Sequence, residues 1–366
     1  MTLIFLSSRC GPILKSGSQT NVSTKIYSLK DFLGNPSYPD TFWTNSTPET
    51  EGMDSGYLIK ALEFIDRQYY EIHSFLVIRH GKLVFERYGR DKSVANKQLT
   101  PNDLHEMHST TKTFTSALIG IAIHEGLISN INVKVMDYFR NSRINNLTGD
   151  KERMTIGNLL TMQSGLEYSE GNDDSLYSIP FNSAEAILGK PMAGTPDSTW
   201  NYSSGNSQIL SEILRRASGK TPLQYGRDKL FTPLGISDFR WMSDQSGTQY
   251  GGWGLFIKPR DLARFGYLYL NKGAWKGSAI VPASWVEVST TSHSLTPWPS
   301  GKYGYHCWIP NIGGFATRGY MGQNMYIFPD KDLIIVFTSA LPYQSADIDL
   351  DVIVRDFVLK SLIQTN

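Results

Sequence analysis

The chain has 366 residues, with 35 basic and 34 acidic side chains and a formal net charge of +1 at pH 7. This length suits one large domain or two closely packed ones, with 40% hydrophobic residues to build a substantial core. The balanced charge gives no electrostatic reason to expect nucleic acid or an anionic membrane surface as partner, and no stretch approaches the ~20 apolar residues that span a bilayer. We therefore expect a soluble protein, cytoplasmic or periplasmic, with a small molecule as its partner.

Residues 1–50 are expected to form an irregular leader. The opening "MTLIFLSSRCG" has a short apolar run, but it lacks a basic segment and is shorter than the apolar core of a secretory signal. Either a disordered tail or the remnant of a signal sequence fits this pattern. The two cysteines, Cys10 and Cys307, are too few for a disulfide framework and belong to no C-x-x-C pair.

The predicted elements begin with a helix in "YLIKALEFIDRQ", where Leu58, Leu62, Ile65 and Tyr69 recur every three or four positions. The next segment, "FLVIRHGKLVFERY", has two runs of β-branched and aromatic residues separated by His-Gly-Lys at 80–82. Such a pattern predicts a β-hairpin.

The middle third, from about residue 104 to 270, has mostly helical patterns broken by Gly, Pro and Asn loops. "NMYIFPDKDLIIVFTSA" then predicts two strands joined at residues 329–332, and "IDLDVIVRDFVLKSLI" predicts a closing amphipathic helix. This order predicts an α/β (α+β) domain over residues 51–366. Its antiparallel sheet, from residues 51–105 and 270–366, is flanked by N- and C-terminal helices, and residues 106–269 form an inserted, mostly helical part. Catalytic groups would lie in the cleft between the two parts.

A single S-x-x-K, residues 109–112, precedes a run at 113–123 that holds only small, hydroxylated or apolar side chains. A helix there would be apolar on nearly all faces and therefore buried. Ser109 and Lys112 would share one helix face. Burial would lower the pKa of Lys112 from its usual ~10.4 toward the range of a general base. The alternative is that Ser109 caps the helix and Lys112 extends to solvent.

Two further segments carry candidate groups. "WNYSSGNSQILSEILRRASGK" places Tyr202 in a polar loop before a helix, where a phenol beside an ammonium ion can shuttle protons; the alternative is an ordinary half-buried ring. "RGYMGQNMYIFPDKD" places Gly319 and Gly322 where a strand begins. Glycine lets the backbone approach a ligand, and an N–H there would complement the Ser109 N–H in stabilising an oxyanion; the alternative is a β-bulge without function.

In this order and spacing the segments resemble the serine hydrolases of the β-lactamase and penicillin-binding-protein superfamily. Their signature is S-x-x-K on a buried helix, then Y-x-N or Y-x-S, then a K-T-G-like strand. Here the second motif is Tyr-Ser-Ser at 202–204, and the third is altered around residues 317–319. "TTKTFTSALIGIAIHEG" and "GYMGQNMYIFP" are most similar to the branch of 6-aminohexanoate-dimer hydrolase and related carboxylesterases. The resemblance runs from about residue 50 to the C-terminus.

The resemblance implies a role for each matching residue. Ser109 would be the nucleophile, and Lys112 with Tyr202 would form the proton-transfer pair. Ser204, the third residue of the second motif, would hydrogen-bond near Lys112 or bind the substrate.

The third motif would supply part of the oxyanion hole. The resemblance implies donors at the backbone N–H groups of Ser109 and of Tyr320, which follows the substrate-binding Gly319. The cationic residue that this motif has in β-lactamases falls at Thr317, and Arg318, one place along a strand, would point to the other face. A neutral ester or a linear amide is therefore expected in preference to a β-lactam.

The expected reaction is hydrolysis through an acyl-enzyme on Ser109, without a metal or organic cofactor, by a monomer or homodimer. The alternatives are β-lactamase or D,D-peptidase activity, or a non-catalytic penicillin-binding or sensor protein on the same fold. Residues 105–108 hold the only close histidine pair, with no H-E-x-x-H or cysteine pair, so the sequence predicts no metal site. The G-x-S-x-G of an α/β-hydrolase is absent.

Aromatic residues are candidates for the pocket wall. The candidates are Tyr168, Tyr177 and Trp308. Of these, Tyr168 and Trp308 are predicted to bind the substrate. The loop "YSEGNDDSLYSIPFNS" is polar and long enough to act as a lid. Its acidic pair, Asp173 and Asp174, is expected to face solvent.

Overall fold

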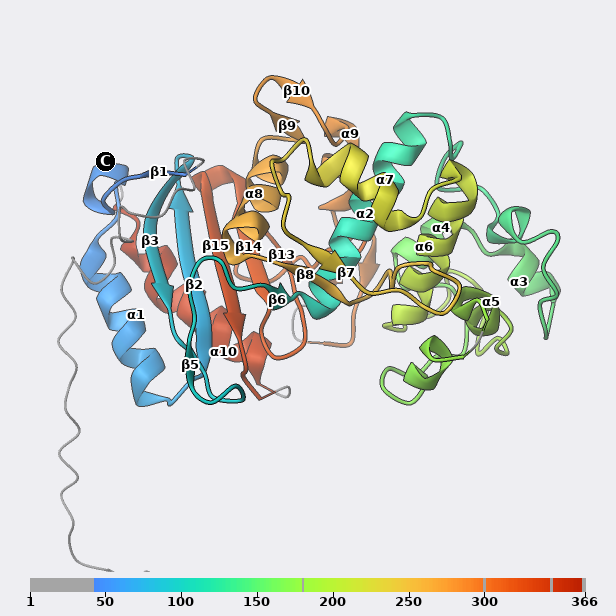
Figure 1. The fold of residues 1–366 in the computed structure, drawn as a ribbon, viewed down its shortest axis with the longest axis horizontal. Helices are drawn as coiled ribbons and strands as arrows, with labels where there is room; N and C mark the ends of the chain where they lie inside the picture. Colours follow the sequence, from blue (N-terminus) through green and yellow to red (C-terminus); the bar gives the residue numbers. More distant parts are fainter. Residues whose placement is uncertain (1–42, 180, 299–300, 343–344, 364–366) are drawn as a thin grey trace, which may run out of the picture.

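A computed structural model describes residues 43–179, 181–298, 301–342 and 345–363 (Figure 1). Its centre is a six-stranded sheet with the strand order β1-β3-β2-β15-β14-β13. The strands are β1 (Thr44–Asn45), β2 (Ile72–Arg79), β3 (Lys82–Tyr88), β13 (Phe315–Thr317), β14 (Asn324–Phe328) and β15 (Leu333–Ser339). Neighbouring strands are antiparallel except β1, which pairs with β3 in parallel. The predicted antiparallel sheet is confirmed, and the short parallel strand at its edge is an addition.

Both predicted strand pairs are present. β2 and β3 form a hairpin whose turn residues, His80 and Gly81, have φ angles of 49° and 69°, in the left-handed region that a two-residue hairpin turn requires. β14 and β15 are joined at residues 329–332, as expected. Every residue of β15 is buried, because helices cover both faces of the sheet.

Three helices cover the sheet (Figure 1). They are α1 (Ser55–Arg67), α8 (Pro259–Leu270) and α10 (Ala346–Ile353). Alternate residues of β2 serve the two faces: Phe75 and Val77 pack with the cluster that includes α1 and α10, whereas Leu76 and Ile78 pack with the cluster that includes α8. The predicted first and closing helices are confirmed, but Tyr69 does not belong to the apolar stripe of the first helix, because α1 ends at Arg67 and the Tyr69 ring is exposed. α8 falls within the span expected for the helical part, yet it packs against β14 and β15.

The other helices gather beside the β13 edge of the sheet (Figure 1). They are α2 (Thr111–His124), α3 (Gly149–Arg153), α4 (Ile156–Leu160), α5 (Ser183–Leu188), α6 (Ser204–Ser218), α7 (Pro222–Gly226) and α9 (Ala283–Ser289). α2 is central, and residues 111–122 are all buried, as the apolar run predicted. Phe114 of α2 stacks on Phe265 of α8, with ring centroids 3.8 Å apart, which joins the helical group to the sheet.

Short strands complete the described chain. β6 (His105–Glu106), β8 (Leu255–Ile257) and β7 (Arg240–Trp241) form a small antiparallel sheet, and β6 leads directly into the turn that begins α2. The minor pairs are β4 (Arg90–Asp91) with β5 (Lys97–Gln98), β9 (Ala274–Trp275) with β10 (Ser278–Ala279), and β11 (Ser294–Leu295) with β12 (Lys302–Tyr303).

Residues 1–42, most of the expected leader and Cys10 with it, lie outside the described residues. Cys307 is a buried free thiol. Among the described helices, none combines the length and apolar character needed to cross a bilayer.

A buried ion pair fastens α8 to β3. Arg260 donates to Glu86 through Nε (2.8 Å to Oε1) and Nη2 (2.5 Å to Oε2), and both side chains are more than nine-tenths buried. Tyr88 also donates its hydroxyl to Glu86. This bidentate geometry holds the helix in one position on the sheet.

We predict that Arg260→Met lowers the free energy of unfolding by about 3–5 kcal/mol, because it leaves the Glu86 carboxylate buried without its counter-charge. Urea unfolding followed by circular dichroism measures this change. Arg355→Met, which breaks the exposed pair with Asp356, is the matched control and should leave the free energy of unfolding nearly unchanged. Equal losses in the two variants would contradict the prediction.

Candidate active site

Ser109 lies in a single 3-10 turn, His108–Thr110, between β6 and α2. His108 has a φ of 44°, a left-handed conformation that costs a non-glycine residue on the order of 1 kcal/mol. The Thr110 hydroxyl donates to the carbonyl of Gln323 (2.6 Å) and lies 3.0 Å from Thr317 Oγ1. The turn that carries Ser109 is thus held against the connection between β13 and β14.

Lys112 is buried, with 1% of its surface exposed. Its Nζ lies 2.9 Å from Ser109 Oγ, 2.9 Å from Ser204 Oγ and 3.1 Å from the carbonyl oxygen of Gly252. Three oxygens match the three N–H donors of an ammonium group. The alternative in which Lys112 extends to solvent is wrong, since α2 is enclosed on all sides.

Burial lowers the pKa of Lys112 to about 8, while the charges of Glu170 and Asp174 act in the opposite direction. A lysine with this pKa is partly neutral near pH 8, whereas an exposed lysine with a pKa of ~10.4 is almost fully protonated there. The neutral amine has a lone pair that can accept the hydroxyl proton of Ser109.

Tyr202 precedes Ser203, the residue that caps α6 through its side chain. The Nζ of Lys112 lies 4.7 Å from the centroid of the Tyr202 ring, so the aromatic face is turned toward the cation. The same ring stacks on Trp308, with centroids 5.9 Å apart. Tyr202 therefore lies in the loop where the sequence placed it, next to the buried lysine.

Glu170 is a site residue that the sequence reasoning missed. Its carboxylate accepts from the backbone N–H of Ser204 and from the Ser204 hydroxyl (3.1 Å). Since Ser204 Oγ also lies 2.9 Å from Lys112 Nζ, a hydrogen-bonded chain runs from the lysine to the carboxylate. No spacing in the sequence marks Glu170, because this contact depends on how its loop folds over α6.

The two aspartates of the same loop have different environments. Asp173 pairs with Lys190 (2.5 Å), and only 16% of its side chain is exposed. Asp174 borders the cleft beside Glu170. The expectation that this acidic pair faces solvent is therefore wrong for Asp173, whose carboxylate anchors the loop.

A cleft of about 880 Å³ opens at these residues. The residues singled out from the sequence that line it are Ser109, Tyr168, Tyr202, Ser204, Trp308, Gly319 and Tyr320. Three other tryptophans, Trp200, Trp253 and Trp298, add to its aromatic wall. Tyr177 is buried behind Tyr168, with the two hydroxyls 3.4 Å apart, and does not line the cleft.

Gly319 and Tyr320 lie in the connection between β13 and β14. β14 begins at Asn324, at the start of the predicted strand segment, so both glycines of this stretch precede it. A Cβ on Gly319 would lie 2.4 Å from the carbonyl oxygen of Met107, so only glycine fits this close approach. The ring of Tyr320 meets the ring of His108 edge-on at 5.4 Å. The backbones next to Ser109 and Tyr320 are therefore adjacent.

Thr317 and Arg318 have different partners. β13 ends at Thr317, which contacts Thr110 in the turn before α2, whereas Arg318 follows the strand and pairs with Asp351 (2.9 Å) and Asp347 (3.5 Å) of α10. The expectation that Arg318 points away from the site is wrong, because Arg318 lines the cleft together with Asp347. Its charge is compensated there by two carboxylates.

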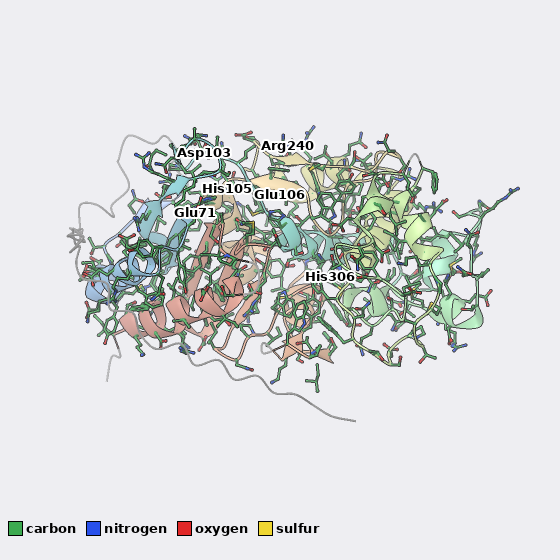
Figure 2. All side chains as sticks on the ribbon, turned by 90° about the horizontal axis from the view of Figure 1, so that it is seen from below. Glu71, Asp103, His105, Glu106, Arg240 and His306 are labelled. Carbon is green, nitrogen blue, oxygen red and sulfur yellow. The ribbon has the colours of Figure 1, made fainter. Side chains whose placement is uncertain are left out.

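His306 is buried next to the site and lies near the middle of the molecule in the view of Figure 2. Its Nε2 lies 2.9 Å from Ser207 Oγ on α6, and its carbonyl accepts from Thr113 Oγ1 on α2 (2.7 Å). Burial lowers its pKa to about 3, so the ring is neutral at pH 7. This histidine thus links the two helices that carry Lys112 and Ser204 without adding a positive charge.

The fold and the sequence both have known relatives. The 6-aminohexanoate-dimer hydrolase of Paenarthrobacter ureafaciens is 25% identical over 297 residues, which are 74% of this chain and 72% of the relative. A candidate 6-aminohexanoate-dimer hydrolase of Bacillus anthracis has a similar structure, with a TM-score of 0.67, 24% identity and 83% of each chain covered. EstCE1, a hydrolase with promiscuous acyltransferase activity, has a TM-score of 0.68 at 15% identity, over 83% of this chain and 99% of that one. Both structures show the fold.

A family model described as Beta-lactamase matches residues 72–356, more than three quarters of the sequence. The match begins at β2 and extends past α10, so it includes both strands of the hairpin, the turn that carries Ser109 and the closing helix. The chain therefore belongs to the β-lactamase family and is a hydrolase of the superfamily of β-lactamases and penicillin-binding proteins.

Proposed function

We propose that this protein is a serine hydrolase that cleaves carboxylic esters or linear amides through an acyl-enzyme on Ser109. The observation that carries the proposal is the distance of 2.9 Å between Ser109 Oγ and the Nζ of Lys112, whose pKa burial lowers to about 8. A serine hydroxyl next to a buried, partly neutral amine has the arrangement of an activated nucleophile.

In the acylation step, the Ser109 hydroxyl gives its proton to the Lys112 and Tyr202 pair as Oγ bonds to the substrate carbonyl carbon. The carbonyl electrons move to the oxygen, which the backbone N–H groups of Ser109 and Tyr320 stabilise. The close approach of Gly319 to Met107 supports this pairing. When the tetrahedral intermediate collapses, the bond to the leaving alcohol or amine breaks, and the leaving group takes a proton from Tyr202.

In the deacylation step, water gives a proton to the same pair and attacks the acyl carbon, which restores Ser109 and releases the acid. Glu170 and Ser204 are proposed to position the amine, since the Ser204 hydroxyl lies between the carboxylate and Lys112. The negative charge of Glu170 also favours the protonated form of Lys112. It therefore raises the pH at which Lys112 becomes neutral and can accept a proton.

The cleft supports a neutral acyl group. Its wall is rich in tryptophan and tyrosine, which bury apolar substrate surface. Arg318, the cation in the third motif, is already paired with Asp347 and Asp351, so it is a poor partner for the carboxylate of a β-lactam. The relative from P. ureafaciens is named as a hydrolase of the 6-aminohexanoate dimer, an amide, which agrees with the proposed cleavage of amides.

We predict that Ser109→Ala lowers kcat/KM for p-nitrophenyl acetate and butyrate by at least about 10³-fold and that Lys112→Ala lowers it by about 10²–10⁴-fold, because they remove the nucleophile and its base. Ser116→Ala, which removes another buried hydroxyl of α2, is the matched control and should keep most of the activity. Nitrocefin should be turned over slowly, and a linear ω-amino amide tests amidase activity.

Two results would contradict this assignment in different ways. No turnover of any of these substrates, together with a stable covalent adduct on Ser109 from a penicillin or a fluorophosphonate, would indicate a penicillin-binding or sensor protein. Full activity in Ser109→Ala, or no adduct at all, would exclude Ser109 as the nucleophile.

The pH dependence gives a separate prediction. kcat/KM should rise to a plateau with an apparent pKa near 8, because the reactive form holds Lys112 neutral. Glu170→Gln removes a charge that raises this pKa, so its profile should move to lower pH while the amide keeps an acceptor for Ser204. Asp228→Asn, an exposed carboxylate elsewhere, is the control. A profile that stays in place or moves to higher pH in Glu170→Gln would contradict the role of Glu170.

A further inference from the structure

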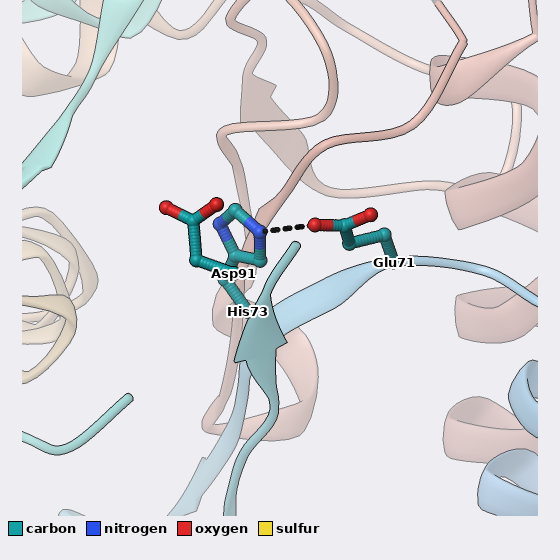
Figure 3. A group of neighbouring side chains, drawn as sticks. All are labelled: Glu71, His73 and Asp91. Atoms are coloured by element: carbon teal, nitrogen blue, oxygen red, sulfur yellow. Dashed lines mark hydrogen bonds and ion pairs between the residues drawn. The ribbon is translucent and has the colours of Figure 1, made fainter. Parts of the chain in front are cut away.

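Three side chains with metal-binding atoms meet at one end of β2, outside the cleft (Figure 3). Glu71 immediately precedes β2, His73 lies within it, and Asp91 lies in β4, which follows β3. One ligand atom from each lies within 4.8 Å of the other two. Figure 3 shows the imidazole of His73 between the two carboxylates.

We propose that Glu71, His73 and Asp91 bind a divalent transition-metal ion, with zinc as the best fit, and that His105 is the fourth ligand. Nothing in the proposed hydrolysis uses this site. The sequence reasoning predicted no metal site, because the ligands come from three separate segments and form no spaced motif.

The distances suit a small tetrahedral ion. His73 Nε2 and Glu71 Oε1 are 3.3 Å apart. Two donor atoms bound at about 2.0–2.1 Å to one tetrahedral zinc are about 3.4 Å apart, so this pair needs almost no movement. Only 10% of the His73 side chain and 16% of the Glu71 side chain are exposed, which leaves the pair ordered but within reach of solvent.

His105 supplies an independent observation. Its Nε2 is buried and has no hydrogen-bond partner among the described residues, although a buried polar atom normally has one. The rings of His105 and His73 have centroids 5.5 Å apart, close to the spacing of about 5 Å for two imidazoles on one tetrahedral zinc. Figure 2 shows Glu71 and His105 on the same side of the molecule. His105 lies outside the group whose ligand atoms are within 4.8 Å of one another, so its ring must move toward the ion for this nitrogen to bind it.

The surrounding charges are compatible with a cation. The ammonium of Lys92 lies 3.4 Å from Glu71 Oε2, and the Lys92 backbone N–H donates to Oε1 (2.8 Å). Because 63% of the Lys92 side chain is exposed, displacing this surface ion pair costs little. The Asp91 carboxylate is oriented by Ser93, whose N–H and hydroxyl both donate to Oδ1. A mixed set of imidazole and carboxylate donors favours zinc over calcium or magnesium, which prefer oxygen alone.

His105 connects the proposed metal site to the segment that carries Ser109. β6 continues through Met107 and His108 into the turn that carries Ser109. An ion held jointly by β2, β4 and β6 would fasten this segment to the sheet. Bound zinc should therefore stabilise the folded chain, since a ligand that binds the native state raises its stability.

The test uses the full, untagged chain after chelator treatment. Isothermal titration with zinc sulfate should show one ion per chain with a micromolar or tighter dissociation constant, and zinc should raise the Tm. Cobalt(II) should give the visible absorption of a tetrahedral ion. His73→Gln and Asp91→Asn should each weaken binding at least tenfold, whereas His124→Gln, a histidine at the far end of α2, is the control and should bind normally.

Replacing the buried His73 could disturb folding. Asp91 lies on a two-stranded hairpin, so Asp91→Asn tests the site without changing that buried residue. Circular dichroism checks that both variants are folded. Absence of zinc binding at 100 µM ion would overturn the proposal, as would unchanged binding in His73→Gln and Asp91→Asn. Unchanged binding in His105→Gln would overturn its assignment as fourth ligand. Because titration does not depend on turnover, these outcomes are separate from those of the hydrolase assays.

Discussion

The buried ammonium of Lys112 is the constraint around which the site is organised. A charge removed from water costs several kcal/mol unless it is paired and hydrogen-bonded. Lys112 meets this requirement with oxygens from Ser109, Ser204 and Gly252, which lie on three separate segments. The turn that carries Ser109, the start of α6 and the loop between β7 and β8 that holds Gly252 must therefore come together whenever Lys112 is buried. The same burial lowers the pKa of Lys112 to about 8.

The supports around this lysine all connect α2 to its neighbours. Thr110 holds the start of the helix against the carbonyl of Gln323, Phe114 stacks on α8, and Thr113 bonds to the carbonyl of His306. These contacts are buried, where hydrogen bonds and packing tolerate little displacement. The segment that carries Ser109 is consequently held in one position. His108, in the left-handed conformation, turns the chain into α2.

The electrostatics of the cleft explain both its reactivity and its proposed selectivity. Acidic groups dominate its charged lining, and its one arginine, Arg318, is paired with Asp347 and Asp351. Glu170 reaches Lys112 through Ser204, so the carboxylate that favours the ammonium form also orients the amine. The aromatic wall offers apolar surface to the acyl group. A neutral ester or amide suits such a cleft better than an anion.

The residue pattern was sufficient for the main helices and strands of the fold, but it did not indicate the edge strand β1 or the short strand pairs. The 3.6-residue repeat of α1, the His-Gly turn between β2 and β3 and the uncharged run of α2 each express local backbone preferences and burial, which the sequence carries directly. S-x-x-K was equally readable, because Ser109 and Lys112 lie about one turn apart where the 3-10 turn leads into α2.

The partners of these residues depended on long-range packing. Ser204 and Gly252 are 92 and 140 positions from Lys112, Glu170 reaches Ser204 across a folded loop, and Glu71, His73 and Asp91 come together from segments that are separate in the sequence. No periodicity encodes such meetings. These contacts depend on which faces of the sheet and helices pack against one another. The order of the motifs could therefore be read from the sequence, whereas the charged partners of the site residues were determined only by the tertiary structure.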